Sequence, residues 1–383
     1  MAVAKATPDV DLEHVGPGTL AGRYLRRFWH PVHRAQDLPA GRAKPIKVLG
    51  EQFTLYRAQD GQPHLVDFRC PHRGVPLAIG WVEGDGIRCR YHGWRYDGAG
   101  RCVEQPGIDG PAPEVRVRTY PVREYVGLVF AYLGEGDPPP FKQYPDLDLP
   151  GVLVADPPEY FPCSFWNRLE NDRAHVSWTH RSTATRLGHL HFLAQWREEL
   201  EETPYGFVLK RSAPGQAPIK SHWHMPTTYQ FAIRSRARGY EHLDLWDTKF
   251  AFTVPIDDEH FVAFDVTRTP LEGEAAAAYA VQRAAEQEAE AKVRWDLAEK
   301  ILAGELAIEE IPDEVSHYNG FIIEDYVTQV GQGPIRDRTH ERLGRNDVKP
   351  IFIRRLWRRE LRALAAGQPL MDWQAPRQPL GRD

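Results

Sequence analysis

Two short segments of the sequence each place a cysteine just ahead of a histidine: Cys70-Pro-His72 and Cys89-Arg-Tyr-His92. They hold two of the four cysteines in a chain of 383 residues, and sixteen residues separate them. Two sulfur and two nitrogen ligands can hold a zinc ion tetrahedrally, or a [2Fe–2S] cluster with two thiolates on one iron and two imidazoles on the other. The alternative is two buried cysteines and two ordinary histidines that never meet. Because four such residues in two short segments are hard to obtain by accident, the spacing favours a metal centre.

The composition indicates a large folded protein without a nucleic-acid or membrane partner. Hydrophobic residues make up 42% of the chain and aromatic residues 11%, enough for a well-buried core. The net charge is -5 with no long basic run, and no stretch approaches the ~20 apolar residues of a membrane helix. The N-terminus has early acidic residues and no apolar segment typical of a secretion signal. We therefore expect a cytoplasmic protein, in which Cys beside His more often binds metal than forms a disulfide scaffold.

Residues 46–133 consist of short alternating runs separated by turn signals. Asp60-Gly61 and Asp97-Gly98 interrupt these runs, and Asp-Gly between alternating runs is a strong hairpin signal. We expect a small antiparallel β domain here, with both Cys–His pairs on loops. Residues 125–133 are interpreted as one further strand.

A glycine follows closely after each histidine of the two pairs. Gly74 and Gly93 allow tight loops that turn backbone N–H groups toward the sulfides of a cluster. Aromatic Tyr91 and Trp94 are expected to shield the site from water. The other two cysteines, Cys102 and Cys163, have no such partners and are interpreted as small core residues.

The segments C-P-H-R-G and C-R-Y-H-G-W resemble those of the Rieske [2Fe–2S] proteins, over about residues 45 to 135. The resemblance implies that Cys70 and Cys89 bind one iron of a cluster, and that His72 and His92 bind the other. Imidazole in place of thiolate raises the reduction potential, which suits accepting electrons from a reductase.

The composition and the expected secondary structure change after residue 133. Residues 134–151 are rich in Pro, Gly and Asp and are expected to form a linker or a surface crossing. Residues 205–268 contain β-like runs. The segments expected to be helical are residues 165–180, 272–302 and 321–332. We therefore expect an α+β fold, with an N-terminal all-β domain at residues 25–135 and a larger α+β domain at residues 150–383 that has a central antiparallel sheet and surrounding helices.

A second group of candidate ligands follows the expected β domain. His175 and His180 lie five residues apart, and Asp172 precedes the first by three. Five residues turn a regular helix by about 500°, so the two imidazoles would not quite share a face. A helix that ends or distorts near Ser177 would bring them together. The alternative is two ordinary helix histidines, one buried and one exposed.

The pattern D-x-x-H-x-x-x-x-H after such a domain resembles the iron-binding segment of the Rieske non-haem iron oxygenases. That family holds a mononuclear Fe(II) with two histidines and one carboxylate, which leaves positions open for oxygen. The resemblance implies that His175 and His180 are ligands and that Asp325, in a segment similar to the family's late ligand helix, is the carboxylate. Glu324 is the rival ligand, because about 100° of helix rotation separates neighbours and only one can face the iron. Both acids could also lie on a solvated face.

Asp172 has a role of its own in this resemblance. In the family's trimers, the corresponding acid links the Rieske histidine of one subunit to an iron-ligand histidine of the next. Here it would join His92 of one chain to His175 of another, orient both imidazoles and carry the electronic connection. The alternative is a local salt bridge. Many members have Asn three residues before this Asp, where this chain has Leu169, so the bridging role stays open.

The C-terminal region, from Gly331 on, contains Gln-Gly, Asp-Arg and Glu-x-Leu-Gly, as in the phthalate-dioxygenase-like oxygenases. That resemblance spans residues from about 25 to 370 and implies one kind of subunit, assembled as a homotrimer or a stacked hexamer. The chain has no Walker loop, no G-x-G-x-x-G motif and no plant-type ferredoxin cysteine run. We therefore expect a separate NAD(P)H-dependent reductase with flavin and iron–sulfur centres.

Together the resemblances imply the terminal oxygenase component of a Rieske system. It would be an oxidoreductase that uses O2 and reductase-supplied electrons to hydroxylate, dihydroxylate or demethylate an aromatic or small cyclic substrate. Two alternatives remain open: a Rieske electron-transfer protein that lacks a working mononuclear iron, and a zinc-structured binding module.

Residues 205–265 are the expected location of the substrate pocket. The polar or soft side chains there are His222, His224, Met225, Tyr229, Arg234 and Arg236. An arginine could hold a substrate carboxylate, although each of these residues is as readily an ordinary core or surface residue.

Overall fold

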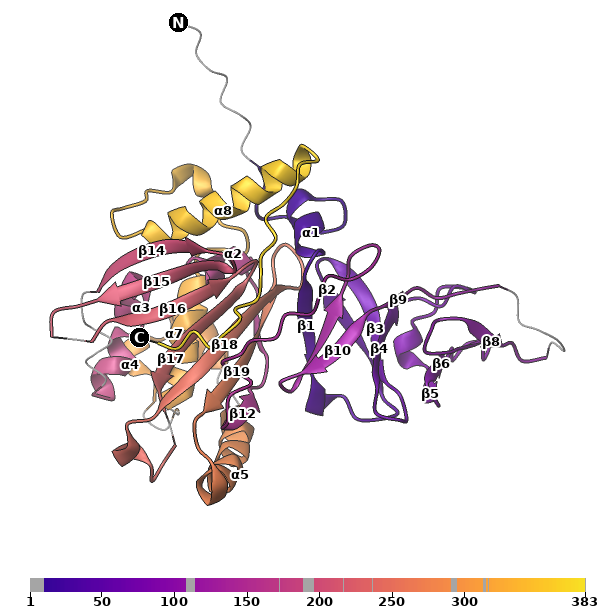
Figure 1. Ribbon diagram of the computed structural model, residues 1–383, viewed down its shortest axis with the longest axis horizontal. Helices are drawn as coiled ribbons and strands as arrows, with labels where there is room; N and C mark the ends of the chain where they lie inside the picture. The colour runs from indigo at the N-terminus through magenta and orange to yellow at the C-terminus, as the bar shows by residue number, and fades with distance from the viewer. Residues whose placement is uncertain are drawn as a thin grey trace, which may run out of the picture.

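The computed structural model of the protein describes residues 10–107, 114–171, 173–188, 196–215, 217–235, 237–290, 295–312, 315 and 317–382. Three small antiparallel sheets form the N-terminal part, and one eight-stranded antiparallel sheet with helices forms the rest (Figure 1). The expected α+β fold is confirmed.

The N-terminal part begins with helix α1 (Leu20–Leu25), whose N-cap Thr19 accepts a hydrogen bond from the N–H of Gly22. Its strands are β1 (Trp29–Arg34), β2 (Ala43–Val48), β3 (Glu51–Arg57), β4 (Pro63–Asp67), β5 (Trp81–Glu83), β6 (Gly86–Arg88), β7 (Arg95–Tyr96), β8 (Cys102–Glu104), β9 (Thr119–Tyr120), β10 (Val122–Tyr125) and β11 (Leu128–Tyr132). They pair in the orders β1-β11-β10, β2-β3-β4-β9 and β5-β6-β7-β8. The last of these sheets lies at the end of the molecule away from the large sheet (Figure 1).

Tight turns account for two of the chain reversals in this part. β3 and β4 join through Asp60-Gly61, where Gly61 has a φ of 90° that glycine adopts without steric cost, so the predicted hairpin is confirmed. Residues 125–133, in contrast, are not one strand. Val126 (φ 46°) and Gly127 (φ 78°) form a turn between β10 and β11. Two consecutive positive φ values are typical of a type I′ turn, for which Val-Gly is a weak sequence signal.

The second part is built on the large sheet. Its strands are β12 (Val152–Ala155), β13 (Glu159–Phe161), β14 (Arg197–Thr203), β15 (Gly206–Ser212), β16 (Ile219–His224), β17 (Thr228–Arg234), β18 (Trp246–Pro255) and β19 (Phe261–Thr269). They run in the order β12-β19-β18-β17-β16-β15-β14, and β13 also pairs with β19. The predicted β-rich region at 205–268 and the central antiparallel sheet are thus confirmed.

The helices of the second part are more broken than expected. They are α2 (Phe165–Leu169), α3 (Arg173–Thr179), α4 (Arg181–Arg186), α5 (Gly273–Glu290), α6 (Trp295–Leu302), α7 (His317–Val330) and α8 (Val348–Ala365). The segment 165–180, expected to be one helix, contains α2 and α3. The helix expected at 272–302 contains α5 and α6, and residues 291–294 between them lie outside the described residues.

One hydrophobic cluster extends through both parts of the chain. Phe130 of β11 and Phe252 of β18 pack edge to face with ring centroids 5.6 Å apart. The N–H of Leu49 also donates to the carbonyl oxygen of Pro255 at 3.0 Å. Burial of a large apolar side chain contributes roughly 2 kcal/mol, so this shared core holds the N-terminal sheets in a fixed place against the large sheet. Across the described ranges, none of the helices combines the length and the apolar composition that crossing a membrane requires.

Candidate metal centres

The two Cys–His loops share one backbone hydrogen-bond pattern. In each loop the cysteine N–H donates to the carbonyl oxygen five residues later, at 2.9 Å from Cys70 and at 2.8 Å from Cys89. The glycine four residues after the cysteine donates back to the cysteine carbonyl, at 2.9 Å from Gly74 and at 3.0 Å from Gly93. Both glycines have positive φ, 77° and 72°. Two different sequences therefore present their cysteines in the same way.

Both cysteines of this pair are buried, with 2% of Cys70 and 3% of Cys89 exposed. Burial raises the pKa of the Cys89 thiol, and the neighbouring Cys70 thiol raises it further. A metal charge beside the Cys89 thiol would favour its thiolate form, which is the form that binds metal. The Tyr96 hydroxyl lies 3.1 Å from Cys70 Sγ, close enough to donate a hydrogen bond to a thiolate.

The two histidines lie side by side at the tips of the loops. The ring centroids of His72 and His92 are 4.7 Å apart, with an interplanar angle of 62°. Trp94 stacks flat on His72 at 4.3 Å and covers one face of the ring. Tyr91 lies against His92 with ring centroids 3.8 Å apart and is itself 54% exposed.

Two buried thiols behind two adjacent imidazoles make up the donor set of a [2Fe–2S] cluster with mixed ligands. A cluster that divides four ligands between two irons suits the arrangement of the two loops.

The second centre forms around His180, at the junction between α3 and α4. His180 is the N-cap of α4, with φ -90° and ψ 16°, and is 6% exposed. The distortion predicted near Ser177 therefore occurs three residues later. The ring lies between two acids of α7: Nδ1 is 3.0 Å from Glu324 Oε2, and Nε2 is 3.7 Å from Asp325 Oδ1.

The two acids of α7 have different surroundings. Glu324 is completely buried, while the Asp325 side chain keeps 20% of its exposure. Asp325 Oδ2 accepts a hydrogen bond from Arg168 Nη1 at 3.1 Å, a contact with no signal in the sequence. Phe321, one turn earlier on α7, packs edge to face on His180 at 5.0 Å.

The remaining predicted residues of this centre are less fully described. Asp172 lies outside the described residues. His175 lies on α3, whose backbone is described, but its side chain falls outside the description. α3 contacts both α4 and α7, so the helix that carries His175 packs beside the helix that carries Asp325. The structure thus brings His180, Asp325 and Glu324 together.

Comparison with known proteins decides the family. The family model for the Rieske [2Fe-2S] domain matches residues 28–121. The 5,5'-dehydrodivanillate O-demethylase oxygenase subunit of Sphingobium sp. (strain NBRC 103272 / SYK-6) is 30% identical over 381 residues, covering 93% of this chain and 80% of that protein. The chain belongs to the Rieske oxygenase family. It is an oxidoreductase, the oxygenase subunit of such a system, and it carries a Rieske [2Fe–2S] cluster.

Further relatives of this Rieske oxygenase subunit agree with that assignment. The phthalate 4,5-dioxygenase oxygenase subunit of Pseudomonas putida is 29% identical over 377 residues, covering 91% of this chain and 84% of that protein. The predicted resemblance to the phthalate-dioxygenase-like group is confirmed, and the zinc-structured binding module is set aside.

Solved structures share the fold of this subunit at low sequence identity. NdmA of Pseudomonas putida CBB5, solved as a QL mutant with caffeine, superposes with a TM-score of 0.67 at 19% identity, over 90% of this chain and 93% of that chain. The oxygenase of carbazole 1,9a-dioxygenase, solved in complex with a ferredoxin, has a TM-score of 0.61 at 21% identity over the same shares. The curated relatives are named as oxygenase subunits, which agrees with the expectation of a separate electron-transfer partner.

The short helix α2 of the subunit is fixed at both ends by one ionic cluster. At its C-terminal end, buried Glu170 binds the guanidinium groups of Arg336, Arg338 and Arg354, with Arg354 Nε at 2.5 Å. At its N-terminal end, the cap Ser164 donates to Glu13 at 2.5 Å, and Glu13 pairs with Arg338 at 2.7 Å. The Asp-Arg motif of the C-terminal region therefore supplies a cation that holds both ends of α2.

The large sheet has two faces, and two of the predicted pocket residues lie on the face away from the candidate metal ligands. Strand alternation puts His222 and His224 on one face of β16 and Trp223 on the other. Gly381 of the C-terminal segment lies on the histidine face, its carbonyl oxygen 3.2 Å from His222 Nε2. Lys349 of α8 lies over the Trp223 ring on the opposite face. In Figure 1 the C-terminal segment crosses the front of the sheet, while α3, α4 and α7 lie behind it. His222 and His224 are therefore not part of a pocket at the metal centre.

The metal-side face is aromatic and basic. Tyr229 and Phe231 of β17 stack at 5.0 Å and are both only partly buried. Arg211 donates to the Tyr229 hydroxyl at 2.8 Å. Lys349 lies 4.9 Å from the Tyr229 ring and donates to the carbonyl oxygen of Asn171, in the α2–α3 turn. Of the predicted pocket residues, Tyr229 is therefore the one on the side of the helices that carry the candidate ligands.

The other predicted pocket residues lie elsewhere. Met225 is buried in the main core. Arg234 has a 57% exposed side chain that pairs with Asp244, so it lies on a solvated strand face. Arg236 lies outside the described residues.

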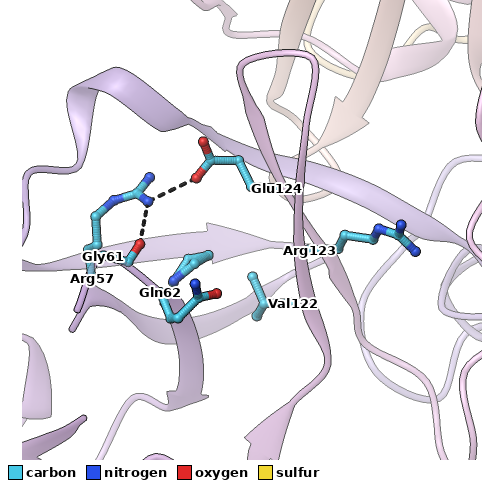
Figure 2. Close-up of a pocket in the computed structure, with 7 residues that line it drawn as sticks. Arg57, Gly61, Gln62, Val122, Arg123 and Glu124 are labelled. Carbon is cyan, nitrogen blue, oxygen red and sulfur yellow. Dashed lines mark hydrogen bonds and ion pairs between the residues drawn. The ribbon is translucent and has the colours of Figure 1, made fainter. Parts of the chain in front are cut away.

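A separate hollow of about 460 Å³ lies in the N-terminal part, between the β3–β4 turn and β10. Figure 2 shows that Arg57 spans it, donating to the carbonyl oxygen of Gly61 at 2.7 Å and pairing with Glu124 at 2.9 Å. Of its charged lining residues, Arg57 and Glu124 pair with each other, and Arg123 lies over the Phe141 ring. Neither a cysteine nor a histidine is among its lining residues.

Proposed function

We propose that this Rieske oxygenase subunit oxidises an aromatic or small cyclic compound at a mononuclear Fe(II) held by His175, His180 and Asp325. The observation that carries the proposal is the pairing of His180 Nε2 with Asp325 Oδ1 across 3.7 Å, at the junction of α4 with α7. When bound, the iron supplies the activation of O2, because two histidines and one carboxylate leave coordination positions open.

The Rieske cluster belongs on the other pair of loops. Cys70 and Cys89 would bind one iron, and His72 and His92 the other. In this division, residues 25–135 receive electrons and residues 150–383 oxidise the substrate. The matching loops, the two buried thiols and the adjacent rings of the two histidines support the assignment.

Electron transfer within one chain is unfavourable because the two centres lie far apart. The β5-β6-β7-β8 sheet with its loops lies at one end of the molecule, and α3 and α4 lie toward the other (Figure 1). The family resemblance implies that Asp172 would bridge His92 of one chain and His175 of the next, in a homotrimer or stacked hexamer.

Exposed aromatic side chains beside both centres support this contact between chains. Tyr91 beside His92 is 54% exposed. Trp178, on the helix that carries His175, is 70% exposed, with the Arg181 guanidinium 4.9 Å from its ring. Large apolar side chains exposed at such positions are typical of protein contacts.

The electrons would come from an NAD(P)H-dependent reductase with flavin and iron–sulfur centres. The sequence itself lacks a dinucleotide-binding motif, so hydride oxidation needs another protein.

Aromatic methyl ethers are the first substrates to test. The O-demethylase subunit matches 93% of this chain. In such a reaction, an ether R–O–CH3 with O2, two electrons and two protons gives R–OH, formaldehyde and water. The phthalate dioxygenase subunit, which matches 91% of the chain, makes ring dihydroxylation the second reaction to test. Tyr229 and Phe231 offer an aromatic surface against which a flat ring can pack.

The test compares His180→Ala and Asp325→Ala with the wild type and with a control, His260→Ala, which changes a histidine on the surface. Each protein is supplied with reductase, NAD(P)H, aromatic methyl ethers or aromatic acids, and ¹⁸O2. We expect the two site variants to keep the brown Rieske spectrum and to lose product formation, while the control keeps both. Product at the wild-type rate from His180→Ala would show that His180 is not an iron ligand.

A further inference from the structure

The ring of His180 is held from both sides by neighbouring acids of α7. Nδ1 lies 3.0 Å from Glu324 Oε2, within hydrogen-bond distance, and Nε2 lies 3.7 Å from Asp325 Oδ1. The side chains of His180 and Glu324 are 7% and 0% exposed, whereas Asp325 keeps 20%. Asp325 is therefore the more accessible of the two acids beside the ring.

The other oxygen of Glu324 is bound to the same short helix. Oε1 accepts from the N–H of Thr183 at 3.0 Å and from the Thr183 hydroxyl at 2.8 Å. A backbone N–H can only donate, so Oε1 acts as an acceptor. Glu324 thus holds α4 through three contacts, and its orientation is fixed before any metal binds.

We propose that Glu324 is a positioning residue that accepts the Nδ1–H of His180 and so directs the lone pair of Nε2 toward the metal beside Asp325. This inference rests on the proposed function, in which His180 and Asp325 bind iron. A carboxylate that accepts from the outer nitrogen of a ligand histidine fixes its tautomer and ring orientation and makes it a stronger ligand. Thr183 fixes the carboxylate in turn.

The same geometry argues against Glu324 as the ligand itself. Its two oxygens are occupied by His180 and Thr183, and its side chain is completely buried. An oxygenase iron needs open positions for oxygen next to substrate, and these require the more open side of the ring. Asp325 lies on that side.

The experiment measures Fe(II) affinity rather than turnover. A chelator removes the mononuclear iron while the cluster, followed by its absorbance, is retained, and Fe(II) is titrated back without oxygen. The variants are Glu324→Ala, Glu324→Gln and Thr183→Val. The matched control is Asp156→Asn, since Asp156 is also buried, 1% exposed, and accepts from three groups, Arg283, Gln287 and Thr267.

We expect Glu324→Ala to weaken Fe(II) binding by about 10- to 100-fold, as the loss of a histidine's outer carboxylate does in other metal sites. Glu324→Gln keeps an acceptor for Nδ1–H and should lose less affinity, and Thr183→Val should lose least. Asp156→Asn should lower the melting temperature and leave the Kd for Fe(II) within about twofold of wild type. If Glu324→Ala does not fold, the Fe(II) affinities of Thr183→Val and Glu324→Gln still test the inference.

Two results would overturn the inference. One is a Kd for Glu324→Ala or Glu324→Gln equal to that of wild type, which would give Glu324 no influence on the metal. The other is tight binding in Asp325→Ala together with none in Glu324→Gln, which would make Glu324 the ligand. Failure of the proposed function looks different, because the wild-type protein itself would then bind no Fe(II) beyond the cluster.

Discussion

Arg168 and Asp325 form an ion pair beside the proposed iron, with Arg168 Nη1 3.1 Å from Asp325 Oδ2. Burial alone would lower the pKa of Arg168, but Asp325 and other nearby acids raise it overall, so the guanidinium stays charged. The pair leaves Asp325 Oδ1 as the oxygen that faces His180. Arg168 thereby holds one oxygen of Asp325, and the other oxygen faces His180, where the proposed iron would bind.

Replacement of Arg168 should therefore loosen the metal site. Arg168→Met leaves a partly buried carboxylate without its cation, and we expect Fe(II) affinity and turnover to fall by about 10-fold or more. Arg168→Lys keeps the charge but loses the planar guanidinium, and should give intermediate values. Iron content per chain and turnover rate check this, and full values for both variants would exclude a role for the pair.

The two loop glycines should differ in their tolerance of a side chain. Both have positive φ, which costs roughly 1 kcal/mol for alanine. A Cβ on Gly93 would also lie 2.7 Å from Pro106 Cγ, whereas a Cβ on Gly74 meets nothing within 4 Å. We expect Gly93→Ala to reduce cluster content and melting temperature clearly more than Gly74→Ala does. Equal losses of cluster content and melting temperature in the two variants would mean that the positive φ, and not the contact with Pro106, causes the effect.

Tyr96 should tune the Rieske cluster through Cys70. Its hydroxyl lies 3.1 Å from Cys70 Sγ, and a hydrogen bond to a cluster sulfur favours the reduced form. Tyr96→Phe should therefore lower the midpoint potential while the cluster stays bound. Tyr56→Phe is the control, because Tyr56 is equally buried but donates to the carbonyl oxygen of Asp85 at 3.1 Å. The midpoint potentials are measured by voltammetry. Equal potentials in Tyr96→Phe and Tyr56→Phe would show that the Tyr96 contact with Cys70 does not tune the cluster.

His224 should make folding stability depend on pH. Burial lowers its pKa to about 3 from an ordinary 6.5. Between these values the unfolded chain binds a proton that the folded protein does not, so the free energy of unfolding falls as pH falls. One such group contributes a slope of about 1.4 kcal/mol per pH unit. The free energy of unfolding, measured with urea at pH 6, 5 and 4, should depend less steeply on pH in His224→Gln than in wild type. An equal pH dependence in both proteins would show that His224 does not cause it.

The sequence was sufficient to predict the Rieske part because the proposed ligands of the cluster lie in two short segments. Cys70 is close to His72 along the chain, and Cys89 is close to His92, so their spacing alone predicts two ligand loops. Residue spacing does not decide whether Glu324 or Asp325 is the candidate metal ligand. Neighbours on a helix point about 100° apart, and which one faces solvent depends on how α7 packs against α4.

The pocket could not be placed from the sequence for a related reason. Alternation along β16 puts His222 and His224 on one face but does not say which face the metal-binding helices cover. Arg168 gave no sequence signal at all, since its partner Asp325 lies 157 residues away. Contacts of that range follow from packing, and only the folded chain reveals them.

We propose that one chain carries two metal centres, a Rieske cluster and a mononuclear iron. The most direct measurement is iron, zinc and acid-labile sulfide per chain in protein purified without oxygen. The account predicts about three irons for two sulfides, with zinc absent. Two irons for two sulfides, unchanged when Fe(II) is added, would instead describe an electron-transfer protein without a working mononuclear iron.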